Sequence, residues 1–383
     1  MPKLVIRAGG LWPALPALFV LAAVATAVAK QAPGATAFGA FWHSGRAVLD
    51  GRSPYPPAAS LPHAAERLSF VPFVYPAPAA VALVPLAVLP FGVANLLWLA
   101  LGVAAVALAL RLLGVTDWRC AALVYASFPA DSALAEGTFS PLLLLAVAAA
   151  WRWRDHALRC GAAVAAAVVC KLFLWPLVAW LVLTRRLRAA AGAAVLAAFS
   201  IVVSWAAVGF DGLRGYPALL GRLTSLVGPN SFSLYALGRS AGVGARAADL
   251  VPVVIAVAVV AAFARRGDRA GICGALAATL IATPILWPHY LMLLVVPLAL
   301  AAPSFGALWF APSLLWLDSH PWSYGRSGRI AFELAVALVL CAAPYARSVA
   351  STSSAWVSGF TFRITRFTSP FSSMTNVDRS TPI

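Results

Sequence analysis

The chain has little charge: only 10% of its 383 residues are Asp, Glu, Lys or Arg, against about a quarter in an average soluble domain. Hydrophobic residues make up 62% of it, and apolar runs of nearly span length recur along most of the chain. Runs of about 20 residues cross a hydrocarbon core of about 30 Å. Because these runs are continuous rather than alternating, a transmembrane β-barrel is disfavoured. The composition predicts an all-α, polytopic membrane helical bundle of about 10–12 spans.

Cysteine and the common catalytic motifs are also scarce. The five cysteines are scattered in or beside apolar runs, without Cys-x-x-Cys or Cys/His spacing, so we expect small buried residues and no metal. Glycine-rich nucleotide loops, a Gly-x-Ser-x-Gly elbow and His-Glu-x-x-His do not occur. These absences argue against a cytosolic nucleotide-sugar or ATP and predict no cofactor. A donor, if the protein uses one, would be carried in the membrane.

The charge that is present is mostly basic and gives a net charge of +16. Arginines cluster in three short connections, at 152–159, 185–188 and 265–269. Anionic membrane lipids and the positive-inside rule explain such clusters, and nothing resembles a nucleic-acid-binding module. We therefore expect these connections on the cytoplasmic side of a bacterial plasma membrane, with membrane lipids and no nucleic acid as partners.

Two apolar segments need interpretation. Leu11–Ala29 follows Lys3 and Arg7 and could be a cleaved signal peptide, but we interpret it as a retained first span. Residues 161–184 have cytoplasmic flanks on both sides, yet this segment is long for one span and short for two. A shallow hairpin with Lys171 at its outer tip satisfies both flanks, whereas a tilted single span would invert everything after it.

Two long polar segments are expected outside the membrane, Gln31–Pro76 and Gly209–Ala247. The first is aromatic and basic, and the proline-containing stretch Ala77–Leu89 after it is expected to lie in the interface or to re-enter. A passive anchor needs no such loop, whereas a membrane enzyme acting at the bilayer surface does. Residues 1–346 are therefore the expected membrane domain, and the Ser/Thr-rich residues 347–383 the expected disordered cytoplasmic tail.

Acidic residues number only twelve, so the candidates for a catalytic base can be enumerated. A base that deprotonates a sugar or lipid hydroxyl outside the membrane must come from an outer segment, and we select Asp50, Asp131 and Glu136. Each has a plainer interpretation. Asp50 precedes a glycine in a turn signal, and the other two lie in a short outer turn where they could cap helices.

Lys171 is the most costly charge in the chain, because it is embedded in an apolar segment. Such charges usually face a cavity or a partner, although a lysine can also extend to the interface. His289 and Tyr290 lie where an apolar helix meets the outer surface. The histidine could donate a hydrogen bond to a phosphate or transfer a proton, but an ordinary aromatic belt would supply the same cluster.

Five motifs occur in an order and spacing that resemble glycosyltransferase family 87 over roughly residues 11–345: FWHSGRAVLDGRSPY, FVYPAPAAVALVPLAVLP, EGTFSPLLLL, AAVVCKLFLWPL and TPILWPHY. The resemblance implies a GT-C-like fold whose long first extracytoplasmic loop contains interfacial helices. It also implies an inverting transfer of a sugar, with mannose favoured, from a polyprenyl-phosphate donor to an envelope lipid or glycan acceptor on the outer face. Lys171 falls on the family's embedded lysine and His289 on its His-Tyr position. The expected donor-phosphate residues are Lys171, His289 and Arg46, and the expected substrate-binding residues are Tyr55, Tyr75, Asn230 and Tyr290.

One position departs from this pattern. In many family members the first loop opens with Asp-Phe or Asp-Leu, whereas this chain has Ala37-Phe38. Either another outer carboxylate serves as the base, or the protein is a non-catalytic partner in envelope assembly. A membrane transporter or lipid flippase is a further alternative, which predicts repeated halves and midplane charges. Of these features the chain offers only Lys171.

Overall fold

The computed structural model describes residues 36–61, 71–319 and 324–346, together with residues 17, 18, 20–22, 25 and 29. The chain divides into two units, Met1–Pro344 and Tyr345–Ile383, and the first contains nearly all of the described residues. The predicted tail 347–383 and most of the predicted first span 11–29 lie outside the described residues.

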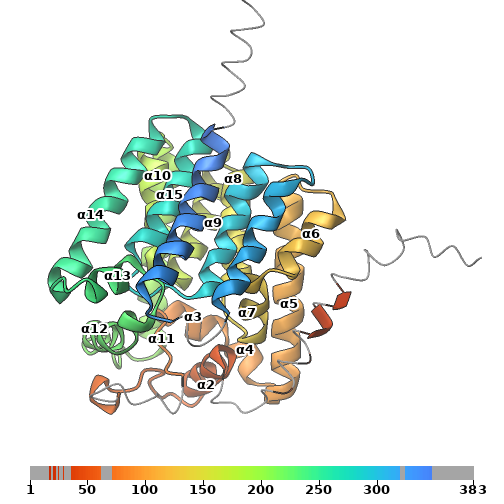
Figure 1. The fold of residues 1–383 in the computed structure, drawn as a ribbon. Helices are drawn as coiled ribbons and strands as arrows, with labels where there is room; N and C mark the ends of the chain where they lie inside the picture. Colours follow the sequence, from red (N-terminus) through yellow and green to blue (C-terminus); the bar gives the residue numbers. More distant parts are fainter. Residues whose placement is uncertain are drawn as a thin grey trace, which may run out of the picture. The chain divides into compact units, whose positions relative to one another are not determined.

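Helices are the only regular secondary structure in the part of the chain that the structure describes (Figure 1). In chain order they are α2 (Ala37–Leu49), η2 (Ala58–Ser60), α3 (Ala77–Ala82), α4 (Val84–Ala87), α5 (Phe91–Leu112), α6 (Trp118–Tyr125), α7 (Phe128–Ala135), α8 (Ser140–Arg152), α9 (Ala157–Cys170), η3 (Leu172–Leu174), α10 (Pro176–Leu183), α11 (Leu187–Ala207), α12 (Tyr216–Val227), η4 (Gly228–Asn230), α13 (Leu234–Ser240), α14 (Ala245–Ala264), α15 (Asp268–Ala282), η5 (Pro288–Leu294), α16 (Val295–Ala301) and η6 (Ala307–Asp318). A last helix spans Ser327–Ala346. Elements labelled η are 3-10 helices.

Four of the described helices are long and apolar enough to cross a membrane: α5, α11, α14 and Ser327–Ala346. The pair α7 and α8, bent by 120°, makes a fifth if it is taken as one span. The predicted class, a polytopic helical membrane protein, is confirmed. The predicted count of 10–12 spans exceeds the number of full-length helices, because prolines at the starts of α8, α10 and η5 divide the apolar runs into shorter helices.

The long helices present apolar side chains outward. Leu97 on α5, Phe199 on α11, Val254 on α14 and Val339 on the last helix are 49%, 66%, 67% and 64% exposed. Contiguous exposed apolar surface of this kind is unfavourable in water and suits contact with lipid acyl chains. The outer faces of these helices therefore define the lipid-facing surface of the bundle.

The three basic connections meet at one end of the bundle. Arg186 donates hydrogen bonds to both carboxylate oxygens of Asp268, at 2.9 and 2.6 Å, and its Nε donates to the carbonyl oxygen of Arg154 at 3.0 Å. The Arg186 guanidinium thereby lowers the pKa of Asp268. Because Arg154 precedes α9 and Arg186 follows α10, both flanks of 161–184 lie at the same end, which confirms the predicted hairpin. Lys171 lies at its turn, directly after α9.

The first polar segment is organised around α2, which lies with α3, α4 and α12 at the lower end of the bundle in Figure 1. Thr36 caps α2 by accepting a hydrogen bond from the Gly39 amide at 3.2 Å. The short helices α3 and α4 pack against α2, and the Trp42 indole donates to the Leu89 carbonyl at 3.1 Å. The stretch Ala77–Leu89 is thus two short helices lying on α2 rather than a span.

Candidate functional site

The bend between α7 and α8 carries Glu136 to the start of α2. The Phe38 amide donates to the Glu136 carbonyl oxygen at 3.1 Å, and the Trp98 indole donates to the Gly137 carbonyl oxygen at 2.8 Å. Gly137 has φ +64, and a Cβ there would lie 2.6 Å from the Cβ of Phe38, so the contact requires glycine. The half-buried Glu136 therefore lies beside Ala37, the position at which the family resemblance implies an acid.

An aromatic layer extends from this bend into the bundle. The ring of Phe41 lies 4.6 Å from Phe139 and 4.8 Å from Tyr75, and Tyr75 lies 5.4 Å from Phe139. The Tyr55 hydroxyl donates to the Tyr75 carbonyl oxygen at 2.9 Å, while its ring stacks on Trp205 at 5.1 Å. Tyr75 thus faces the interior, and Tyr55 holds its backbone in place.

Lys171 lies on the inner side of this layer. Its ammonium nitrogen is 3.5 Å from the centre of the Tyr290 ring, 4.9 Å from that of Tyr75 and 5.4 Å from that of Phe173. The residue is only 6% exposed, and its Nζ has no hydrogen-bond partner among the described residues. Cation–π contacts recover about 2 kcal/mol at a desolvated site, less than the several kcal/mol that desolvating the ion costs. The arrangement favours an incoming anion.

His289 and Tyr290 belong to η5, against which α7 and α8 pack. The His289 ring meets the Tyr290 ring edge-on at 4.6 Å. Tyr290 also stacks on Phe173 at 4.9 Å. The turn of the hairpin and the start of η5 therefore bring Lys171 and His289 to the same Tyr290 ring, next to Tyr75.

A second polar group borders the site, and the sequence reasoning did not select it. Asp318 at the end of η6 and Glu333 in the last helix are both 0% exposed. Burial raises the pKa of Tyr324, which lies between these two acids in the chain. The sequence signal was available, because Glu333 is an acid inside an apolar helix.

Two predicted residues lie toward the far end of α2. A helix of 13 residues is about 20 Å long, and Asp50 follows its last residue. The Asp50 carboxylate pairs with Arg52 at 2.7 Å, and this hydrogen bond lowers the pKa of Asp50. Arg46 faces α4, donating to the Ala87 carbonyl oxygen at 3.4 Å. The structure does not bring Arg46 or Asp50 together with Lys171.

The other two predicted residues lie near the site. Asp131 is half-buried on α7, a little more than one turn before Glu136. Asn230 is exposed at the end of η4, and its Oδ1 lies 3.2 Å from where a Cβ on Gly325 would be. Asn230 therefore borders the turn that contains Tyr324. Of the predicted residues, the structure groups Tyr75, Lys171, His289 and Tyr290 most closely, and Glu136 lies at the end of α7, which packs against η5.

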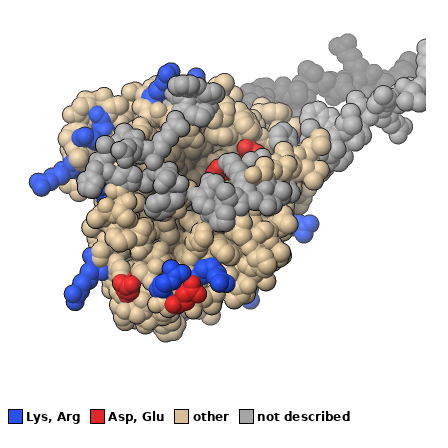
Figure 2. Space-filling model, turned by 90° about the horizontal axis from the view of Figure 1, so that it is seen from below, with Lys and Arg blue, Asp and Glu red and all other residues tan. Residues whose placement is uncertain are grey.

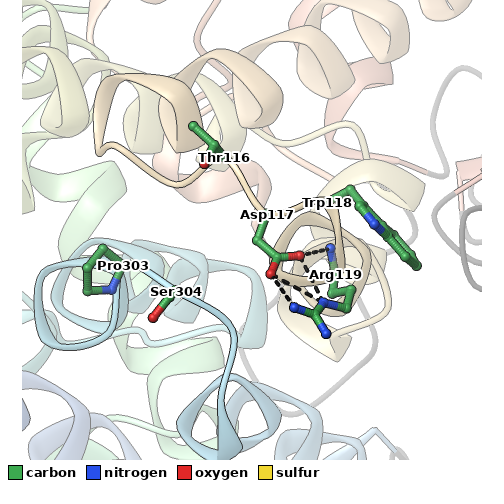
Figure 3. A pocket seen from close by; sticks show the side chains of 6 residues that line it. All are labelled: Thr116, Asp117, Trp118, Arg119, Pro303 and Ser304. Atoms are coloured by element: carbon green, nitrogen blue, oxygen red, sulfur yellow. Dashed lines mark hydrogen bonds and ion pairs between the residues drawn. The ribbon is translucent and has the colours of Figure 1, made fainter.

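The surface charges and the surface pocket of the described residues do not indicate a different functional site. Seen from below, basic side chains lie around the edge of the face; acidic side chains lie among them at the lower edge, and a further acidic group lies nearer the centre (Figure 2). A shallow pocket, lined by Thr116, Asp117, Trp118, Arg119, Pro303 and Ser304, lies beyond the C-terminal end of α5 (Figure 3). Its charged residues pair with each other at 2.7 Å. Gly137 contacts the first half of the 22-residue helix α5, whose full length is about 33 Å, so this pocket is separate from the candidate site.

These features define a polytopic helical membrane protein with a buried cation, a histidine and a loop carboxylate near one end of its bundle. The model of glycosyltransferase family 87 matches residues 73–297, more than half of the chain, and the protein belongs to this family. It is therefore a membrane glycosyltransferase, and the resemblance drawn from its motifs is confirmed.

Two curated relatives carry the same name, polyprenol-phosphate-mannose-dependent alpha-(1-2)-phosphatidylinositol pentamannoside mannosyltransferase. The protein of Mycolicibacterium smegmatis is 29% identical over 307 residues, covering 73% of this chain and 69% of the relative. That of Mycobacterium tuberculosis is 32% identical over 301 residues, covering 69% of this chain and 64% of the relative. No solved structure was found to match the chain.

Proposed function

We propose that the protein transfers a sugar, with mannose favoured, from a polyprenyl-phosphate donor to a lipid or glycan acceptor. The observation that carries the proposal is Lys171, a buried lysine whose Nζ has no hydrogen-bond partner among the described residues. A donor phosphate would accept its hydrogen bonds and stabilise its charged form. The names of the two relatives support the same class of donor.

In this proposal Lys171 and His289 bind the donor phosphate. When the bond between the sugar C1 and the phosphate oxygen breaks, negative charge grows on the leaving polyprenyl phosphate. A fixed cation and an N–H donor in a site that excludes water stabilise that charge, which is commonly the largest protein contribution to such a step. The apolar outer faces of the long helices suit the polyprenyl chain of the same donor.

Glu136 is the proposed base. The acceptor hydroxyl oxygen attacks the sugar C1 on the face opposite the leaving phosphate, which inverts the anomeric centre, and its proton passes to the Glu136 carboxylate. Glu136 is preferred because it lies beside Ala37, whereas Asp50 is exposed and paired with Arg52. Asp131 on α7 is the second candidate, one turn away.

The same geometry suggests which side of the membrane the site faces. The basic connections lie at one end of α9, and Lys171 lies at the other. A helix of 14 residues is about 21 Å long. If the basic end is cytoplasmic, as the positive-inside rule requires, the site opens toward the outer leaflet. The proposed location is the bacterial plasma membrane with an outward-facing site.

The test is transfer by purified protein in detergent micelles, using a lipid and glycan extract as acceptor. Radiolabelled polyprenyl-phosphate mannose and radiolabelled GDP-mannose are offered in separate reactions. The proposal predicts labelled product from the lipid donor alone. Transfer from GDP-mannose, or neither transfer from nor binding of any polyprenyl-phosphate sugar, would contradict it.

A further inference from the structure

Glu333 is a fully buried acid that the proposed chemistry does not use. It lies about 9 Å into the last helix, is 0% exposed, and neither carboxylate oxygen has a hydrogen-bond partner among the described residues. A carboxyl group in such a place is costly unless something binds it. Packing alone would favour an apolar residue at this position.

Asp318 accompanies Glu333 from a different element, η6. One of its oxygens lies 3.3 Å from the Arg329 guanidinium, yet the described residues offer neither oxygen a hydrogen bond of acceptable geometry. Arg329 and Glu333 are four residues apart in the last helix, so their side chains lie on the same face of it. One arginine therefore lies near two buried carboxyl groups, and these groups can accept several hydrogen bonds.

Aromatic rings complete this group. Tyr324 lies 5.0 Å from Phe232 and 5.8 Å from Trp287, and Trp287 precedes His289 by two residues. The turn at Tyr324 is held tightly, because Gly325 has φ +73 and a Cβ there would lie 3.1 Å from the Pro229 carbonyl oxygen. The rings therefore lie between the buried acids and the histidine of the proposed donor site.

The chemistry of this group differs from that of the Lys171 region. Two buried carboxyl groups present oxygen atoms that can accept hydrogen bonds from neutral hydroxyl groups, whereas the anionic oxygens of a phosphate have no hydrogen to donate to them. Aromatic faces pack against C–H groups. Hydroxyl donors on one side and C–H groups on another are the combination that a neutral sugar ring presents.

We propose that Glu333, Asp318, Tyr324 and Trp287 bind a neutral sugar unit of the acceptor and hold its reactive hydroxyl toward Glu136. This inference rests on the proposed function, because it assigns the acceptor half of the same site. Glu136 follows directly after α7, which packs against η5, and η5 begins directly after Trp287, whose ring lies 5.8 Å from that of Tyr324.

The direct test measures binding without catalysis. Saturation-transfer NMR detects methyl α-mannopyranoside on the purified protein in micelles, and Glu333→Gln should reduce the transferred signal about tenfold, since a hydrogen bond to the buried carboxyl group is lost. Asp211→Asn, which removes an exposed acid, is the matched control and should change nothing. A signal undiminished in Glu333→Gln would overturn the assignment.

Two further measurements keep the inference separate from folding and from the proposed function. Trp287→Leu, which keeps an apolar side chain, should also lower the saturation-transfer signal. If Glu333→Gln does not fold, an undiminished signal in Trp287→Leu would overturn the assignment instead. With octyl α-mannopyranoside as acceptor, Glu333→Gln should raise the acceptor KM about tenfold and leave the donor KM unchanged. An unchanged acceptor KM in an active enzyme overturns the inference alone. A protein that binds the mannoside through Glu333 but transfers no sugar overturns the proposed function instead.

Discussion

Replacing Lys171 by methionine should separate stability from activity. Exchanging a buried ion for an apolar side chain of similar volume is often neutral or stabilising, by about 1–4 kcal/mol. Here the variant also loses cation–π contacts with Tyr290, Tyr75 and Phe173, which are worth about 2 kcal/mol at a desolvated site. The net expectation is a protein whose free energy of unfolding lies within about 2 kcal/mol of the wild type, on either side.

The transferase activity of Lys171→Met should fall even though the protein stays folded. If Lys171 stabilises the leaving phosphate, its removal costs about as much as the loss of one preorganised donor, roughly 10²–10³ in kcat. The effect should fall mainly on kcat, because the charge on the phosphate grows as the sugar–phosphate bond breaks. A lysine with a purely structural role would give the reverse, a loss of stability with kcat per folded molecule intact.

The assay pairs thermal unfolding in detergent with transfer from labelled polyprenyl-phosphate mannose, normalised to folded protein. Arg159→Met is the matched control, because it removes an exposed cation at the other end of α9 and should change neither quantity. Full transferase activity in Lys171→Met, or a loss of activity explained by unfolding, would refute the assignment.

Three further predictions follow from the geometry. Gly137→Ala should lower the free energy of unfolding by about 1–3 kcal/mol, because Gly137 has φ +64 and an added Cβ would lie 2.6 Å from Phe38. Gly114→Ala is the control: Gly114 has φ +81 but open space around it, so the loss of stability should be smaller. Equal losses in denaturant titrations would argue against the contact between Gly137 and Phe38. His289→Gln should reduce kcat about 10²-fold without changing the melting temperature, and full activity would remove His289 from the site. Asp268→Asn should cost about 1 kcal/mol at pH 7, since Asp268 is 42% exposed. Because Arg186 lowers the pKa of Asp268, this stabilising contribution is present above the unfolded pKa near 4 and is lost as pH falls through the lower folded pKa. If the stability difference between wild type and Asp268→Asn stayed the same at the lowest pH at which the protein is folded, the prediction would be contradicted.

The class of protein and the hairpin at 161–184 could be predicted from the sequence, because each depends on local features: apolar runs for the class and flanking arginines for the hairpin. Continuous apolar runs with 10% charge indicate membrane helices wherever they fold. Arginines on both sides of 161–184 required its two ends to share one side, and the Arg186 bond to Arg154 bears this out. The span count was less predictable, since apolar length does not reveal where a proline divides one run into two short helices.

The site was only partly predictable for a different reason. Lys171 and His289 are conspicuous by type and place, whereas the choice among Asp50, Asp131 and Glu136 depends on a contact between residues far apart in the chain, Phe38 and Glu136. Tyr55 was predicted to bind substrate, but whether its hydroxyl is available depends on the Tyr75 carbonyl, which occupies it. Asp318 and Glu333 lie in or beside apolar helices, and their burial together is a tertiary property.

The most direct test of the account is whether an acid returned to position 37 can replace Glu136. Glu136→Gln should lower transfer from polyprenyl-phosphate mannose by about 10²–10⁴, the usual contribution of a general base. Because the amide of Phe38, the residue after Ala37, is hydrogen-bonded to the Glu136 carbonyl oxygen, adding Ala37→Asp to that variant should restore at least about a tenth of the lost activity. Full activity in Glu136→Gln would contradict the account, as would an inactive double variant that still folds and binds the donor.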